Sequence, residues 1–188
     1  MIVIGLVGPK RSGKDTVAEY IVQKYGAKSH AHSEIYNEIL RLLKISNTRM
    51  NIIKLVGLRD VFGSNVLIHA LNKKIQEDKA ELEVVTGIRF ENELENIKTY
   101  PQSILIYIDA PVEQRYERQL LEKQYQGDST MSFEEFKEIE AKQPTETHIA
   151  ELKKKCEYIL LNDKGREELF EQVDNILERH EIKLKNKI

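Results

Sequence analysis

The sequence has no tryptophan and a single cysteine, Cys156. One cysteine excludes a disulfide within the chain and any metal site built from several thiolates. Such sparing use of cysteine is typical of a reducing compartment, so we expect a cytoplasmic protein. Tyrosine and phenylalanine are scattered without a platform for stacked bases, and the formal net charge of −2 attracts neither nucleic acid nor an anionic membrane. We expect neither as a partner.

Apolar runs long enough to cross a membrane are also missing. The apolar start, residues 1–8, is too short for a signal peptide or a membrane span and runs into a glycine turn, which indicates a buried strand. Shares of 40% apolar and 32% charged residues are those of an ordinary soluble globular chain. A length of 188 residues fits one domain, so we predict a single domain over 1–188.

Short apolar, β-branched runs bounded by turn residues predict strands. Four are clear and a fifth, over 28–32, is weak; the clear ones are Ile2–Val7, Leu82–Thr86, Ile104–Ile108 and Tyr158–Leu161. Helical spacing follows each of them, with Ser33 expected as the N-cap of one helix and a last helix running from Gly165 towards His180. Strands alternating with helices predict an α/β fold with a parallel sheet. The polar stretch Gln124–Ser132 is predicted to be a surface loop, and 183–188 a frayed tail.

Residues 8–16 match the core of a phosphate-binding loop, G-x-x-x-x-G-K. In such a loop the backbone N–H groups point at phosphate oxygens, the following helix adds its positive end, and the lysine neutralises the β and γ phosphates. The motif follows the first apolar strand and opens a helix, which is the context that supports it. We therefore predict that ATP is bound by Gly8, Pro9, Lys10, Arg11, Ser12, Gly13, Lys14, Asp15 and Thr16.

Asp15 stands where most such loops have the serine or threonine that ligates Mg²⁺. A carboxylate also suits Mg²⁺, a hard cation that prefers oxygen, so Asp15 is a candidate metal ligand. The alternative is a plain acid in the first helical turn, favoured by the helix dipole. The sequence leaves both open.

Several motifs resemble known kinases. The loop, which reads G-P-K-R-S-G-K-D-T, resembles that of phage-type deoxynucleoside monophosphate kinases and is similar to K-R-x-S-G-K-D of animal phosphomevalonate kinases. The stretch V-V-T-G-I-R-F-E-N-E at Val84–Glu93 is similar to D-V-R-F-x-N-E of the same phage-type kinases. Leu58–Gly63 resembles a helical motif of that family and of archaeal adenylate-kinase-related proteins. Three further segments resemble dephospho-coenzyme A kinases: Ile108–Arg118, Ala141–Gln143 and Cys156–Asp163.

The resemblance implies a P-loop NTPase fold of the nucleoside monophosphate kinase-like type, with a five-stranded parallel sheet flanked by helices. It also implies a helical acceptor-binding region at about 34–78, a lid at about 120–148, and Asn162 packed beside the adenine. The chain departs from the pattern in three ways. The strand-end acid is replaced by Thr86 and Gly87, and the first acid of a D-x-D motif by His32. The lid carries lysines in place of the arginines that normally neutralise the transferring phosphoryl group.

The remaining candidates for catalysis are four arginines and an acid. Arg89 follows a strand end, where open α/β sheets bind ligands, and is a candidate clamp for an acceptor phosphate, with Arg59 as a second. Arg115 and Arg118 share a helical face that the resemblance places near ATP. Glu34 is a candidate to accept the acceptor's proton or hold Mg²⁺ through water. For the arginines the alternative is a surface ion pair, and for Glu34 an N-terminal helix acid.

These observations predict an ATP- and Mg²⁺-dependent phosphotransferase acting on a (deoxy)nucleoside monophosphate or a similar small phosphate. Two alternatives stay open. One is a dephospho-coenzyme A kinase, favoured by the C-terminal motifs. The other is a nucleotide-binding regulatory protein with little turnover, favoured by the missing strand-end acid. A homodimer is compatible with all three.

Overall fold

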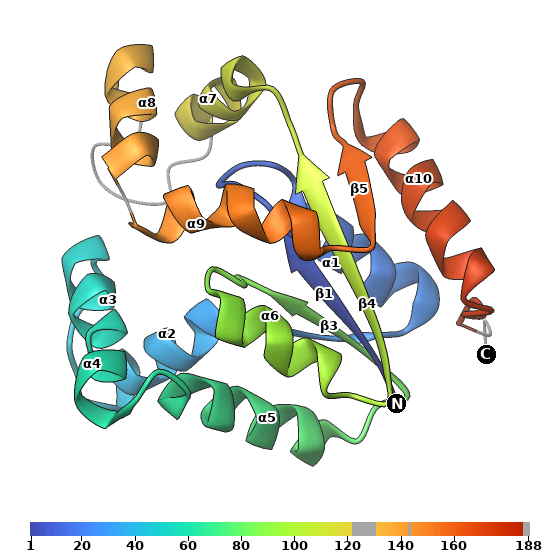
Figure 1. Ribbon diagram of the computed structural model, residues 1–188, viewed down its shortest axis with the longest axis horizontal. Coiled ribbons are helices and arrows are strands. Elements are labelled where there is room, and N and C mark those ends of the chain that lie inside the picture. The colour runs from blue at the N-terminus through green and yellow to red at the C-terminus, as the bar shows by residue number, and fades with distance from the viewer. Residues whose placement is uncertain (122–130, 143, 186–188) are drawn as a thin grey trace.

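The computed structural model describes residues 1–121, 131–142 and 144–185. Within them five parallel strands form one sheet in the order β2-β3-β1-β4-β5 (Figure 1). The strands are β1 Ile2–Val7, β2 Lys28–Ala31, β3 Leu82–Thr86, β4 Gln102–Asp109 and β5 Tyr158–Leu161. The predicted five-stranded parallel α/β sheet is therefore confirmed, including the weak strand signal. β1 is central and pairs with both β3 and β4, so the glycine loop that follows it leaves from the middle of the sheet.

Helices flank this sheet on both faces. They are α1 Lys14–Tyr25, α2 His32–Leu42, α3 Arg49–Val56, α4 Leu58–Phe62, α5 Val66–Asp78, α6 Glu91–Lys98, α7 Val112–Leu121, α8 Phe133–Lys142, α9 Pro144–Leu152 and α10 Arg166–Arg179, with a short 3-10 turn, η1 Lys153–Lys155. In the described part of the chain no helix is long and apolar enough to cross a membrane. Helices α2–α5 fill the segment predicted to bind an acceptor; that role stays a prediction.

The core has two halves, one on each face of the sheet. On one face α1 and α10 pack on the strands through Val17, Ile21, Leu169 and Val173. On the other, α2, α5, α6 and α9 contribute buried residues including Ile35, Leu71, Leu94 and Ile149. The strand residues that separate them, such as Ile4 and Val85, are fully buried. Both faces of a parallel sheet being covered explains why its strands read as continuous apolar runs.

The start of α2 differs from the prediction, and two predicted segments lie partly outside the described residues. α2 begins at His32 with Ala31 as its N-cap, so Ser33 is not the cap that the sequence suggested. The helix starts earlier because β2 ends at Ala31 and turns straight into it. Residues 124–130 of the predicted surface loop and 186–188 of the predicted tail lie outside the described residues.

Candidate functional site

The glycine loop is held in a conformation that its glycines make possible. Gly8 and Gly13 have φ of 148° and 104°, values that side chains rarely tolerate. A Cβ on Gly8 would lie 2.2 Å from the carbonyl oxygen of Ile108, and one on Gly13 would lie 2.4 Å from Nδ2 of Asn162. Gly8 is therefore required by space as well as by dihedral angle, because the Ile108 carbonyl is part of the backbone, whereas at Gly13 a Cβ would displace the Asn162 amide that bonds the loop.

Polar side chains from the far end of the chain fix the loop's backbone. Nδ2 of Asn162, just beyond β5, donates to the Ser12 carbonyl at 2.8 Å. Arg118 on α7 donates to the carbonyls of Arg11 and Asn162, both at 3.1 Å. These bonds pre-order the loop before any ligand arrives. Asn162 and Arg118, both predicted near the nucleotide, thus lie against the loop itself.

Lys14 lies buried at the start of α1, with 7% of its surface exposed. Its Nζ donates to the Pro9 carbonyl at 2.7 Å. Burial, with a smaller contribution from the nearby Arg89 guanidinium, lowers the pKa of the Lys14 ammonium to about 7, since like charges disfavour protonation. An anion beside Lys14 would compensate for both effects. The carboxylates of Asp15 and Glu146 act in the opposite direction and offset the lowering of the Lys14 pKa in part.

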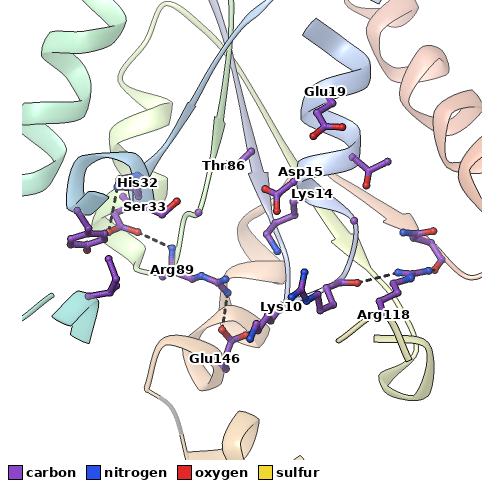
Figure 2. A pocket seen from close by; sticks show the side chains of 18 of the residues that line it. Lys10, Lys14, Asp15, Glu19, His32, Ser33, Thr86, Arg89, Arg118 and Glu146 are labelled. Atoms are coloured by element: carbon purple, nitrogen blue, oxygen red, sulfur yellow. Dashed lines mark hydrogen bonds and ion pairs between the residues drawn. The ribbon is translucent and has the colours of Figure 1, made fainter. Parts of the chain in front are cut away.

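A carboxylate from α9 reaches the loop from the other side. Oε2 of Glu146 accepts the backbone N–H of Lys10 at 3.3 Å, and Oε1 lies 3.0 Å from Nη1 of Arg89 (Figure 2). Arg89 extends from the turn after β3, so this contact joins the loop, the sheet edge and α9. Sequence reasoning did not identify Glu146, because no motif surrounds it and its partner Lys10 is 136 residues away.

One cavity of 890 Å³ runs from the loop to the helices α2 and α3. Figure 2 shows Lys14 and Asp15 near its middle, His32 and Ser33 to one side and Arg118 to the other. Of the predicted site residues, those that line it are Lys10, Arg11, Gly13, Lys14, Asp15, Thr16, Arg89, Arg118 and Asn162. Among the described residues, those predicted for the site but not lining the cavity are Gly8, Pro9, Ser12, Glu34, Arg59 and Arg115.

Arg115 and Glu34 are placed away from the cavity for different reasons. Arg115 is buried in an ion pair with Glu140 of α8 and donates to the carbonyls of Ala110 and Lys10, so it ties α8 to the loop. Arg115 is therefore not part of an exposed surface ion pair, which was the alternative for the arginines. Glu34 is exposed in the first turn of α2, as a plain helix acid would be. A role for either in chemistry stays a prediction.

The R-F-x-N-E motif forms a structural cluster around Arg59 of α4. Nη1 of Arg59 donates to Glu93 at 2.6 Å, Nη2 donates to Asn92 at 2.8 Å, and the guanidinium lies 3.8 Å from the Phe90 ring centre. The other Glu93 oxygen accepts the backbone N–H of Arg89 at 2.7 Å. Arg59 thereby braces the turn that presents Arg89, and a role as a second acceptor clamp stays a prediction.

The metal-binding potential of the site rests on Asp15. Among the residues that the structure describes, no group of three or more His, Cys, Asp or Glu could hold an ion. Mg²⁺ needs no such group, because it keeps several waters and takes one or two carboxylates together with substrate phosphates. Asp15 is exposed in the first turn of α1 and lines the cavity one residue after Lys14, so a single oxygen ligand fits this mode.

The strand-end position that lacks an acid is lined by Thr86 and Gly87, with His32 beside them. Thr86 and His32 are each 4% exposed, and a Cβ on Gly87 would lie 3.4 Å from the backbone nitrogen of His32. This end of the cavity is closed by Tyr36, Phe90 and the apolar side chains of Ile52, Ile53 and Val56. This end therefore combines apolar and aromatic surface with the polar side chains of His32 and Thr86, next to the charged loop.

No family model matches the sequence. A UPF0200 protein of Methanocaldococcus jannaschii is 26% identical over 95% of this chain and 90% of its own length. The deoxycytidylate deaminase of Schizosaccharomyces pombe is 33% identical over 74% of this chain, which spans only 38% of that protein. Among solved structures, a shikimate kinase from Bacteroides thetaiotaomicron superposes with a TM-score of 0.67 at 17% identity, covering 96% of this chain and 98% of that one. At such identity the likeness establishes the fold alone.

Proposed function

We propose that this chain, which has the fold of the P-loop kinases, is a cytoplasmic ATP-dependent phosphotransferase with a small nucleotide or similar phosphate as acceptor. The observation that carries the proposal is a single cavity lined by the glycine loop, Lys14 and Arg89. The loop supplies donors and positive charge for the ATP phosphates, and Arg89 supplies a second cation on the acceptor side. Phosphoryl transfer needs mainly this positioning and charge neutralisation.

In the proposed reaction an acceptor oxygen forms a bond to the γ-phosphorus while the bond to the bridging oxygen breaks and ADP leaves. Lys14 neutralises the β and γ oxygens, and the preordered loop fixes the triphosphate in line. Mg²⁺, held through Asp15, would add charge neutralisation between the β and γ phosphates when bound. Arg89 orients the acceptor, and Ile52 and Val56 of α3 offer apolar surface beside it.

Two observations support a nucleotide as the acceptor. The cavity of 890 Å³ lies in the range of sites that enclose a small organic ligand, and Tyr36 and Phe90 offer aromatic surface beside Arg89. One relative carries the name deoxycytidylate deaminase, which implies that it acts on a deoxynucleotide. A deoxynucleoside monophosphate is therefore our first candidate, ahead of dephospho-coenzyme A.

The contact of Glu146 favours a second candidate function, a nucleotide-binding regulatory protein with little turnover. Its carboxylate lies against a loop N–H and the Arg89 guanidinium, both of which a kinase needs for phosphates. The strand-end acid is also replaced by Thr86. In this alternative, ATP would displace Glu146 and move α9 without transferring a phosphoryl group.

Two measurements separate these functions. Mg·ATP should raise the melting temperature of the protein, because a ligand that binds the native state alone stabilises it, and Lys14→Ala should lose most of that shift. ADP release is then followed with dCMP, dTMP, dAMP, dGMP, dephospho-coenzyme A and shikimate as acceptors. Turnover stimulated by one of them supports the kinase. ATP stabilisation without stimulated turnover supports the regulatory protein, and the absence of any Lys14-dependent stabilisation contradicts both.

A further inference from the structure

His32 is buried at the acceptor end of the cavity without a hydrogen bond. It is 4% exposed, and neither Nδ1 nor Nε2 has a hydrogen-bonding partner among the described residues. Buried polar side chains are nearly always hydrogen-bonded in folded proteins, and an unpaired one destabilises the fold. Two unpaired nitrogens on a residue that lines a ligand cavity therefore point to a partner that arrives from the cavity.

The surrounding side chains do not supply that partner. The nearest charged group is Glu93, whose Oε1 lies 3.8 Å from Nδ1, beyond hydrogen-bonding distance. Glu93 is engaged elsewhere, because Oε1 accepts from Arg59 and Oε2 accepts from the backbone N–H groups of Arg89 and Phe90. The Arg59 guanidinium also neutralises the Glu93 charge. His32 is left facing the cavity with its hydrogen bonds unmade.

The ring is neutral in this position. Burial lowers the pKa of His32, and the attraction of Glu93 is opposed by the repulsion of Arg59. A neutral imidazole has one N–H donor and one nitrogen acceptor. The two nitrogens point away from each other, so one ligand group reaches one of them, either donating to the bare nitrogen or accepting its N–H, and a sugar hydroxyl or the edge of a nucleobase can do either. A phosphate offers acceptors alone and is matched by Arg89.

We propose that His32 is a specificity residue that hydrogen-bonds an uncharged donor–acceptor group of the phosphoryl acceptor. The assignment rests on the proposed kinase function. It places the acceptor's phosphate at Arg89 and its sugar or base at the end of β3, beside Thr86 and between the aromatic rings of Tyr36 and Phe90. An acceptor that lacks such a group leaves the buried imidazole without a hydrogen bond, and a site of that kind discriminates strongly.

The decisive variant is His32→Phe, which keeps a flat ring and removes both nitrogens. If His32 serves a ligand, this variant melts at the same or a higher temperature, because the free protein loses two unsatisfied polar atoms. Its KM for the acceptor rises about ten- to hundredfold, whereas its KM for ATP is unchanged. His32→Asn, which restores one donor and one acceptor, recovers part of the loss.

His30→Phe is the matched control. His30 is also buried, but its Nε2 lies 3.0 Å from Glu83 and it does not line the cavity. Removing it strands a buried carboxylate, so the melting temperature falls while the acceptor KM is unchanged. A ligand-binding histidine is recognised by a raised acceptor KM at unchanged or higher melting temperature, as expected for His32→Phe. A structural histidine is recognised by a lower melting temperature at unchanged KM, as expected for His30→Phe.

The source of the hydrogen-bonding group is identified by comparing dCMP with deoxyribose 5-phosphate. A His32→Phe loss that persists with the sugar phosphate assigns the contact to a hydroxyl, and one that disappears assigns it to the base. In parallel, the ¹H–¹³C spectrum of the histidine rings, assigned with His32→Asn, should show the His32 signal shifting when a productive acceptor binds.

The outcomes are distinct. Wild-type turnover combined with an unchanged acceptor KM in His32→Phe overturns this inference and leaves the kinase standing. A His32→Phe variant that is destabilised, with its acceptor KM intact, overturns it as well. A wild-type protein that neither binds nor phosphorylates any of the six acceptors overturns the kinase function, and this inference falls with it.

Discussion

The buried Lys14 should make ATP binding take up a proton. Burial, with the Arg89 charge adding to it, lowers its pKa to about 7 in the free protein. With phosphate oxygens beside it, the ammonium gains charge-assisted hydrogen bonds that favour the protonated form, so its pKa in the complex rises above the working range. Lys14 is partly neutral in the free protein and fully charged in the complex, so binding must add the missing fraction of a proton.

The magnitude follows from the free-state pKa alone. Lys14 is about nine-tenths neutral at pH 8 and about one-tenth neutral at pH 6, so binding takes up about 0.9 proton at pH 8 and about 0.1 at pH 6. Affinity falls as the pH rises above the free-state pKa, by about fifteenfold between pH 7 and pH 8.5. The triphosphate contributes little over that interval, since phosphate groups titrate near pH 6.

The assay is isothermal titration calorimetry of Mg·ATP binding in buffers with different ionisation enthalpies. The dependence of the apparent enthalpy on the buffer enthalpy gives the number of protons taken up at each pH. Lys14→Arg is the control, because a guanidinium keeps its charge at every accessible pH and should show no uptake. No proton uptake by the wild type at pH 8, or an affinity that is flat from pH 7 to pH 8.5, would refute the reasoning.

Three further predictions concern the residues around Lys14. Asp15→Ala should weaken Mg·ATP binding more than metal-free ATP binding in calorimetric titrations, and equal losses would make Asp15 a plain helix acid. Arg89→Ala should raise the acceptor KM about ten- to hundredfold with little change in the KM for ATP, because a charge-assisted phosphate contact is lost; Arg89→Lys should restore part of it. A loss confined to ATP would place the acceptor elsewhere. Glu146→Gln should tighten Mg·ATP binding roughly three- to tenfold, because a competing carboxylate leaves the Lys10 N–H and Arg89. Glu151→Gln, exposed on the same helix, is its control and should change nothing.

Much of the fold was predictable because the strands and the glycine loop are determined by short stretches of neighbouring residues. The apolar runs at β1, β3 and β5 match their observed bounds. For β1 and β3 the reason is that strands covered on both faces are apolar nearly throughout, whereas β5 lies at the sheet edge and exposes Ile159 and Leu161. The glycine loop was equally accessible, because the spacing of Gly8, Gly13 and Lys14 follows from backbone geometry. The Ser33 cap failed because the end of β2 determined the start of α2, which no local preference of serine could reveal.

The partners of the charged residues could not be predicted, because they are set by distant elements. Arg59 on α4 is bound by Asn92 and Glu93 of α6, more than thirty residues away. Arg89 and Arg115 are likewise paired with acids on other elements, Glu146 of α9 and Glu140 of α8. His32 was noticed as a departure from an acidic motif, but its unpaired nitrogens emerge when α2, α4 and α6 are packed together.

Transfer of the labelled γ-phosphoryl group from ATP is the most direct test of the central claim. The wild-type protein is incubated with Mg²⁺, γ-³²P-labelled ATP and dCMP or another acceptor that stimulates ADP release, and the products are separated by thin-layer chromatography. We predict label in the phosphorylated acceptor, in amounts equal to the ADP formed, and none with Lys14→Ala. Label found in inorganic phosphate alone, or retained in ATP bound to a stabilised protein, would contradict a kinase and favour the regulatory protein.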